Sequence, residues 1–315
     1  MTKFVIKRLF SAIPVLFIVV TLVFFMMRII PGDPALQILG EDAKPEDVAA
    51  LRERMGLNDP LGIQYFKYLR DILKGDWGTS LHNNKPVFEN IKLRLEPTIL
   101  LTIYASCIAI IVGVPFGVLA ARKRNSILDY TLTTTAVLGL SAPGFWVGLM
   151  MVFYFGVTKG WFPVQGYTTI AEGGLGGALY SLTMPAIALS IQYFSSITRY
   201  TRSMMLDVMN NDYIRTARAK GLIETKVYYK HALKNALAPV ITQIGFSIAG
   251  MLGGATVTET VFNINGMGKL AYDSLMRRDY TQEQAIILLV AIIFIFTNIL
   301  LDIIYKMLDP RIEFD

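Results

Sequence analysis

The chain has 315 residues, and 17% of them are charged. With Gly counted and Tyr left out, roughly 56% are apolar, above the 45 to 50% usual for soluble domains, so a soluble fold is disfavoured and a disordered chain is excluded. The single cysteine, Cys107, excludes an intrachain disulfide framework. The net charge of +6 would suit nucleic acid, and only the placement of the basic residues can decide that.

Six stretches contain no Asp, Glu, Lys or Arg, at residues 9–27, 97–121, 130–158, 173–198, 235–258 and 284–301. About 20 mostly apolar helical residues cross a ~30 Å hydrocarbon core, and each stretch is that long or nearly so. Because backbone polar groups in lipid must be hydrogen-bonded internally, helices are the expected form. The alternative is a soluble protein with six such core helices. We predict an all-α integral membrane fold with six transmembrane helices.

The first stretch could be a secretory signal, because basic residues precede an apolar run. It is longer than a signal core, and Arg28 with Pro31-Gly32-Asp33-Pro34 stands where a small-residue cleavage site would lie. We interpret residues 1–30 as a retained transmembrane helix. The fourth stretch opens with a run of glycines, so its span is expected from about Tyr180 to Thr198.

Residues 31–96 form the one long segment of soluble character. The spacing of apolar residues predicts a surface helix over Leu61–Leu73, and Trp77 suits either packing or an interfacial anchor. We expect a small extracytoplasmic helical cap here. Residues 97–315 are then a five-helix transmembrane core.

Orientation follows from the basic residues. With six spans both termini share one side, and sixteen Lys and Arg lie there, against four in the short segments of the other side. Segment 31–96 is too long to count under the positive-inside rule. We predict a multi-pass protein of the cell membrane with both termini in the cytoplasm. Topology therefore accounts for the basic residues, and no nucleic-acid partner is expected.

The cytoplasmic loop 199–235 is the most informative segment. Tyr213, Ala217 and Gly221 lie at i, i+4 and i+8, which predicts one narrow stripe with two minimal side chains. Two short helices joined near Gly221 are expected. The basic residues beside the stripe can pair with acidic groups or carbonyls of a partner. The alternative is an ordinary basic loop.

This loop resembles the cytoplasmic "EAA" loop of permease subunits in binding-protein-dependent ABC importers. Further motifs resemble the dipeptide/oligopeptide/nickel permease family, and its first permease subunit type in particular. The motifs are Asp212–Leu222 with Asn235–Val240, Pro31–Pro34, Gly56–Leu61, Gly75–Ser80, Ser141–Phe145 and Arg278–Tyr280. They extend over nearly the whole chain, so the combination is specific.

The resemblance implies the type I ABC importer permease fold. It also implies partners: a second homologous permease, two cytoplasmic ATPases that hold ATP and Mg, and an extracytoplasmic solute-binding protein. In that family the loop helix docks into a groove of the ATPase. By position, the coupling residues here are Tyr213, Ile214, Arg215, Thr216, Ala217, Arg218, Ala219, Lys220, Gly221 and Leu222.

Two departures from the family pattern are visible. Asp212 stands slightly upstream of the acidic position of the motif, and Asn265 replaces the usual Pro before Gly266. We expect the turn at Gly266 to be kept, because glycine supplies a permissive backbone.

Other chemistry is not expected of this chain. Gly266–Leu270 lacks the spacing and the hydroxyl residue of a phosphate-binding loop. By the predicted topology His82 and His231 lie on opposite sides of the membrane, so they cannot share a metal ion. The sequence pattern places no general base next to a nucleophilic side chain within the spans. We expect no catalytic residue, metal site or cofactor in this chain.

Polar residues in or at the ends of the spans are candidates for a substrate path: Gln192, Gln243, Thr256 and Glu259. The glutamines could equally bond neighbouring helices. A path of amides, hydroxyls and small residues suits short peptides of variable side chain. By resemblance, nickel chelates and glutathione-like solutes are alternatives. An ion-coupled secondary transporter and a membrane enzyme are the other classes, and the absence of Asp, Glu, Lys and Arg from the six stretches disfavours a proton-coupled carrier.

Overall fold

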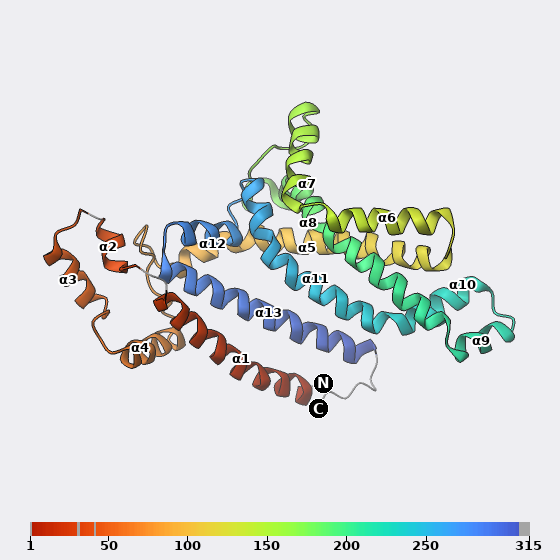
Figure 1. Cartoon of the computed structure of the whole chain (residues 1–315), viewed down its shortest axis with the longest axis horizontal. Coiled ribbons are helices and arrows are strands. Elements are labelled where there is room, and N and C mark those ends of the chain that lie inside the picture. Colours follow the sequence, from red (N-terminus) through yellow and green to blue (C-terminus); the bar gives the residue numbers. More distant parts are fainter. Residues whose placement is uncertain (1, 30–31, 41, 309–315) are drawn as a thin grey trace. The chain divides into compact units, whose positions relative to one another are not determined.

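The computed structural model describes residues 2–29, 32–40 and 42–308, and these ranges are helical apart from turns and one isolated bridge between Thr79 and Pro86 (Figure 1). The elements, with π-helical turns written η, are α1 (Thr2–Ile29), α2 (Pro34–Leu39), α3 (Pro45–Arg54), α4 (Leu61–Leu73), α5 (Val87–Arg122), α6 (Ile127–Ser141), α7 (Gly144–Met151), η1 (Val152–Thr158), α8 (Ile170–Met209), α9 (Asp212–Ala219), α10 (Glu224–Lys226), η2 (Val227–Ala232), α11 (Leu233–Val261), α12 (Met267–Met276) and α13 (Tyr280–Leu308). The predicted all-α class is confirmed.

Five segments of the described chain are long and apolar enough to cross a membrane: Ile6–Ile29, Val87–Arg122, Ile170–Met209, Glu224–Val261 and Tyr280–Ile303. The sixth candidate, predicted as one span over residues 130–158, is a pair of helices bent by 99°. The bend falls at Ala142 and Pro143, whose backbones are extended. Proline disfavours helical backbone in the residue before it and suits the start of the next helix. The prediction of an unbroken helix there is wrong, and six spans result only if the bent pair counts as one.

The chain divides into two compact units, one of residues 1–95 and 269–296, the other of residues 96–268 and 297–315. In the first unit, α4 has the bounds predicted from its periodicity and lies against α1. The buried ring of Phe24 lies 5.2 Å from the ring of Tyr65 and 5.4 Å from that of Tyr68. The hydroxyls of Thr21 and Tyr65 are 2.6 Å apart. Burial raises the pKa of Tyr68 to about 12, so its hydroxyl stays protonated.

A buried carboxylate ties the start of α13 to the segment before α5 in the same unit. The Ser80 hydroxyl and the Leu81 N–H both donate to Asp279, the amide at 3.1 Å. The Asn90 amide donates to the Gln282 side chain at 2.9 Å. These bonds explain Asp279 within the Arg278–Tyr280 motif as a structural residue.

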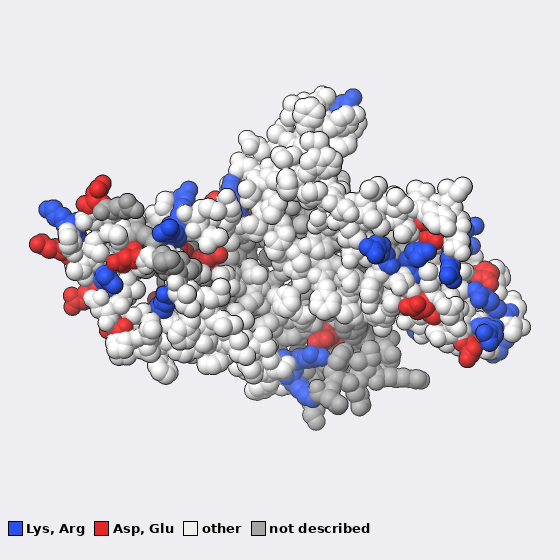
Figure 2. Space-filling model, viewed as in Figure 1, with Lys and Arg blue, Asp and Glu red and all other residues white. Residues whose placement is uncertain are grey.

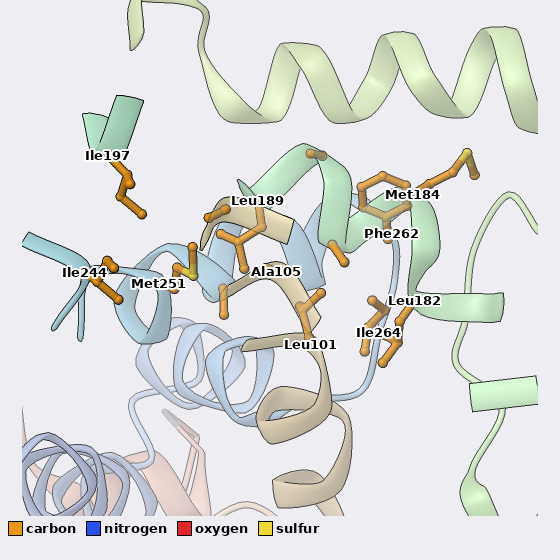
Figure 3. Packing of buried hydrophobic residues seen from close by; sticks show 14 of the residues in the cluster. Leu101, Ala105, Leu182, Met184, Leu189, Ile197, Ile244, Met251, Phe262 and Ile264 are labelled. Atoms are coloured by element: carbon orange, nitrogen blue, oxygen red, sulfur yellow. The ribbon is translucent and has the colours of Figure 1, made fainter. Parts of the chain in front are cut away.

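The second unit contains α6, α8, α11 and most of α5. Gly113 and Gly117 form a GxxxG pair on α5, and a Cβ at Gly117 would lie 2.5 Å from the Thr201 Cβ on α8. Glycine here permits the close helix approach that small-residue motifs provide in membranes. Beside this contact lies the main apolar core, where Leu101, Leu189, Met251 and other side chains of α5, α8 and α11 meet (Figure 3).

Helix α8 is longer than its predicted span from Tyr180 to Thr198, and its capped first turn is separated from the rest by a kink at Gly174, whose backbone is not helical. Thr169 and Glu172 form a capping box. The carboxylate of Glu96 accepts from the Tyr167 hydroxyl at 2.6 Å and from the Ile170 N–H at 2.9 Å. Burial and the bond to Glu96 raise the pKa of the Tyr167 hydroxyl. At the other end α8 runs on to Met209, so the predicted loop 199–235 shortens.

Candidate functional site

The short helix α9 is the centre of the predicted coupling segment. It connects α8 to α10 within the second unit (Figure 1). Asp212 lies in its first turn and Arg218 in its last, which matches the polarity of the helix dipole. The predicted second short helix is wrong, because residues 224–261 continue through α10 and η2 into α11. One separate short helix, α9, therefore lies between the spans, and not two.

One face of α9 is buried against the membrane helices. Ile214 is 0% exposed and Ala217 is 6% exposed. They belong to an apolar cluster with residues of α5, α8, η2 and α11: Val118, Ala121, Met205, Val227, Ala232 and Ala236. Of the predicted stripe, Ala217 is therefore buried in this cluster, which its small side chain fits, whereas Tyr213 and Gly221 are exposed. The burial fixes α9 to residues of α5, α8, η2 and α11.

The opposite face of α9 is exposed and carries two basic residues. Arg215 and Arg218 make ion pairs with Asp212 at 3.5 Å and with Glu224 at 2.9 Å. All four side chains are well exposed, so the pairs stabilise the fold little and can exchange for a partner's groups. Figure 2 shows Lys and Arg gathered over this end of the unit. The exposed basic residues of α9, α10 and the turn between them are Arg215, Arg218, Lys220 and Lys226.

Gly221 follows α9 rather than lying on it. Its φ is +74°, and its N–H donates to the Arg218 carbonyl at 2.9 Å. A Cβ there would meet no atom within 4 Å, so backbone conformation, not lack of space, favours glycine within this chain. Tyr213 and Ile223 lie nearby in sequence and are 43% and 68% exposed. The exposed surface therefore joins basic groups, two apolar side chains and a bare backbone turn.

The two glutamines predicted for a substrate path bond to neighbouring helices. The Gln192 amide donates to the Ala142 carbonyl at 3.1 Å, at the bend between α6 and α7. The Gln243 amide donates to the Ser196 hydroxyl at 3.0 Å, which joins α11 to α8. Both side chains are half-buried. Their amides therefore stabilise helix contacts and leave part of each side chain accessible.

Glu259 and Thr256 lie in closer surroundings than predicted. Glu259 is 0% exposed, and its carboxylate accepts from the Thr98 hydroxyl at 2.5 Å. The Thr98 oxygen in turn accepts from the Met267 N–H at 2.7 Å. A Cβ at Gly268 would lie 2.5 Å from the Thr256 hydroxyl. Glu259 therefore lies inside the unit and not at an open passage. Thr256 is half-buried and lies against the turn that leads into α12.

The buried Glu259 carboxylate also explains Gly266, whose role differs from the one predicted. Its φ is not positive, and the residue with left-handed backbone in this turn is Asn263, at +51°. A Cβ at Gly266 would lie 2.3 Å from the Glu259 carboxylate. A side chain there would displace the buried carboxylate, so lack of space, not backbone conformation, favours glycine at this position.

Sequence reasoning missed a buried ion pair between α6 and α8. The Arg202 guanidinium donates to both carboxylate oxygens of Asp129, at 2.6 and 2.7 Å. Asp129 is 1% exposed and also accepts from the Asn125 N–H. The available signal was an acidic residue beside an otherwise basic turn at residues 122–124. No group of three or more His, Cys, Asp or Glu suited to a metal ion occurs among the described residues.

Two family models match the chain. The model for the N-terminal part of binding-protein-dependent transport system membrane components matches residues 1–102. The model for binding-protein-dependent transport system inner membrane components matches residues 113–314. The chain belongs to this family. It is therefore a multi-pass membrane component of a binding-protein-dependent transport system, and the predicted family is confirmed.

Relatives and solved structures agree with this assignment. The oligopeptide transport system permease protein AppB of Bacillus subtilis (strain 168) is 41% identical over 316 residues, with both chains fully covered. The glutathione transport system permease protein GsiC of Salmonella paratyphi A (strain ATCC 9150 / SARB42) is 41% identical over 314 residues, again with full coverage. An inward-facing structure of the MetNI methionine ABC transporter is 18% identical, with a TM-score of 0.59 over 71% of this chain and 98% of that one. This last likeness shows the permease fold alone.

Proposed function

We propose that this chain is one of two homologous permease subunits of an ATP-driven importer of short peptides. Two cytoplasmic ATPases would bind ATP and Mg²⁺, and an external solute-binding protein would deliver the peptide. The chain itself would hold no cofactor. The observation that carries the proposal is α9: two of its residues are buried against the spans while its other face is exposed. Such a helix can receive force from an ATPase and pass it to the membrane helices.

The orientation belongs to this proposal. Exposed basic residues of the turn after α5 and of α9 and α10 lie in one unit, and the positive-inside rule favours the cytoplasm for them. Thr79 and Thr225 are both exposed. Cysteines placed there, in a chain with Cys107→Ser, should react with an impermeant maleimide from opposite faces of the membrane. Reaction from the same face would contradict the topology.

The coupling role is tested at Gly221. Asp and Asn have similar size and both tolerate left-handed backbone, so the pair isolates charge. Gly221→Asp would bring a carboxylate into the ATPase contact, where an unpaired buried charge costs several kcal/mol. We expect Gly221→Asp to abolish peptide uptake at unchanged membrane levels, and Gly221→Asn to retain a measurable part. If the Gly221→Asp chain still co-purifies with the ATPase and supports normal uptake, the contact with the ATPase lies elsewhere.

The peptide assignment is supported by the oligopeptide relative, and a glutathione importer is the second candidate because that relative is equally similar. Uptake by cells that lack the chain and by cells restored with it distinguishes them. Labelled dipeptides, longer peptides, glutathione and nickel should be compared. We expect peptide uptake to require the chain. Peptide uptake that does not depend on it, in cells without a redundant system, would remove the peptide assignment.

A further inference from the structure

A groove between α6 and α8 of the second unit is lined by Leu140 of α6 and by four residues of α8 that carry hydrogen-bond donors. It has a volume of about 280 Å³ and is lined by Leu140, Ser196, Arg199, Tyr200 and Ser203. This volume far exceeds the roughly 30 Å³ that one water molecule occupies in the liquid. The groove therefore has room for part of a solute.

The donors of this groove have no acceptor of their own. Within the described residues, the side chains of Arg199, Tyr200 and Ser203 make no hydrogen bond or ion pair. Ser196 already accepts from Gln243, so its own hydroxyl hydrogen remains to be donated. No carboxylate of the described chain lines the groove. A guanidinium and three hydroxyls without an acceptor are complementary to an anion.

The groove continues a polar stripe along α8. Gln192, Ser196, Arg199 and Ser203 are spaced at intervals of four, three and four residues, so they share one face over roughly 16 Å of helix. The neighbouring face carries Ser195, Thr198 and Thr201, which are buried towards the glycines of α5 and α6. The two polar faces of α8 thus differ: one is closed by packing, and the other leads from Gln192 into the groove.

We propose that this groove binds the carboxylate of the transported solute, with Arg199 as the principal donor and Ser196, Tyr200 and Ser203 as supporting donors. The proposal rests on the proposed function, because it assigns the groove to the solute and not to a lipid phosphate. Arg199 is exposed, so a charge-assisted bond there is weakened by water and the solute can leave again, as a transport pathway requires. Peptides with a free carboxyl terminus are the matching solutes.

The binding chemistry can be tested on the full chain in phosphatidylcholine nanodiscs. Cys107 is exposed and is first replaced by serine, and Ser203→Cys then reports on the groove. An anionic sulfonate methanethiosulfonate should react with this cysteine faster than neutral methyl methanethiosulfonate does. Arg199→Gln should lower the ratio of the anionic rate to the neutral rate about tenfold, as expected from loss of a hydrogen bond to a charged group, because the neutral reagent corrects for any change in the pKa of the thiol. Lys123→Gln, which removes an exposed charge outside the groove, is the matched control. An equal ratio with and without Arg199 would overturn the site.

The source of the anion is tested by competition in the same nanodiscs. Dialanine should slow the anionic reagent, and dialanine amide, which lacks the carboxylate, should not. Protection by added phosphatidylglycerol without protection by dialanine would make the groove a lipid headgroup site and overturn the assignment to the solute. These labelling rates do not depend on uptake. Failure of the proposed peptide transport would be seen separately, in the uptake comparison between cells that lack the chain and cells restored with it.

Discussion

Two short helices outside the predicted spans, α4 and α9, attach to their units in opposite ways. α4 has 13 residues and none of them is fully buried. It is held by half-buried aromatic rings and one hydroxyl contact to α1. α9 has only 8 residues, yet Ile214 and Ala217 are in an apolar cluster with four other elements. Burial of a few side chains, and not helix length, therefore determines which of the two is rigidly coupled to the membrane helices.

This difference matters for function. In the proposed function, a helix packed among the spans would transmit the movement of a cytoplasmic ATPase to them. Substitutions that weaken the packing of α9 and of α4 separately test this difference.

The largest effect is expected at the ion pair that fixes α8, the helix against which α9 packs. Arg202→Gln leaves Asp129 buried without its cation, which should lower the free energy of unfolding by about 3–5 kcal/mol. Unfolding in detergent micelles, followed by circular dichroism, measures this. Adding Asp129→Asn removes the stranded charge and should restore a large part of the loss. A double variant as unstable as the single one would show that the pair does not act as a unit.

A smaller but still large effect is expected at the inner face of α9. Ile214→Ala leaves a cavity in a closed cluster, which should cost about 2–5 kcal/mol of unfolding free energy. Ile63→Ala in α4 makes the same chemical change at a side chain that is 48% exposed. It should change stability by no more than about 0.5 kcal/mol. The comparison between the two helices fails if these two variants are equally stable.

The smallest effect is expected at the contact of α4 with α1. Tyr65→Phe removes the hydroxyl that lies 2.6 Å from Thr21 and keeps the ring. The expected loss is about 0.5–1.5 kcal/mol, the usual net value of one hydrogen bond. Tyr213→Phe, at an exposed ring of α9, is the matched control and should leave stability unchanged. A larger loss for Tyr65→Phe than for Ile214→Ala would reverse the comparison.

The same contrast explains which predictions succeeded. The bounds of α4 could be predicted because one periodic pattern, a polar face and flanking turn residues all agree. At α9 the prediction placed Ala217 on the docking surface, whereas it is buried. Alanine at position 217 fits a close-packed interior and an open docking surface equally well, and only the neighbours in space distinguish them.

Sequence alone determined the all-α membrane fold, the family and five of the spans, because the length and apolar character of a span are local properties of the chain. Tertiary structure decided the bend at Ala142-Pro143, the burial of Glu259 and Ile214, and the pairing of Asp129 with Arg202. It also brought Arg199, Ser196 and Ser203 to the groove beside α6. These features depend on residues from different helices meeting in space. No local pattern of apolar and polar residues records which helix a side chain will face.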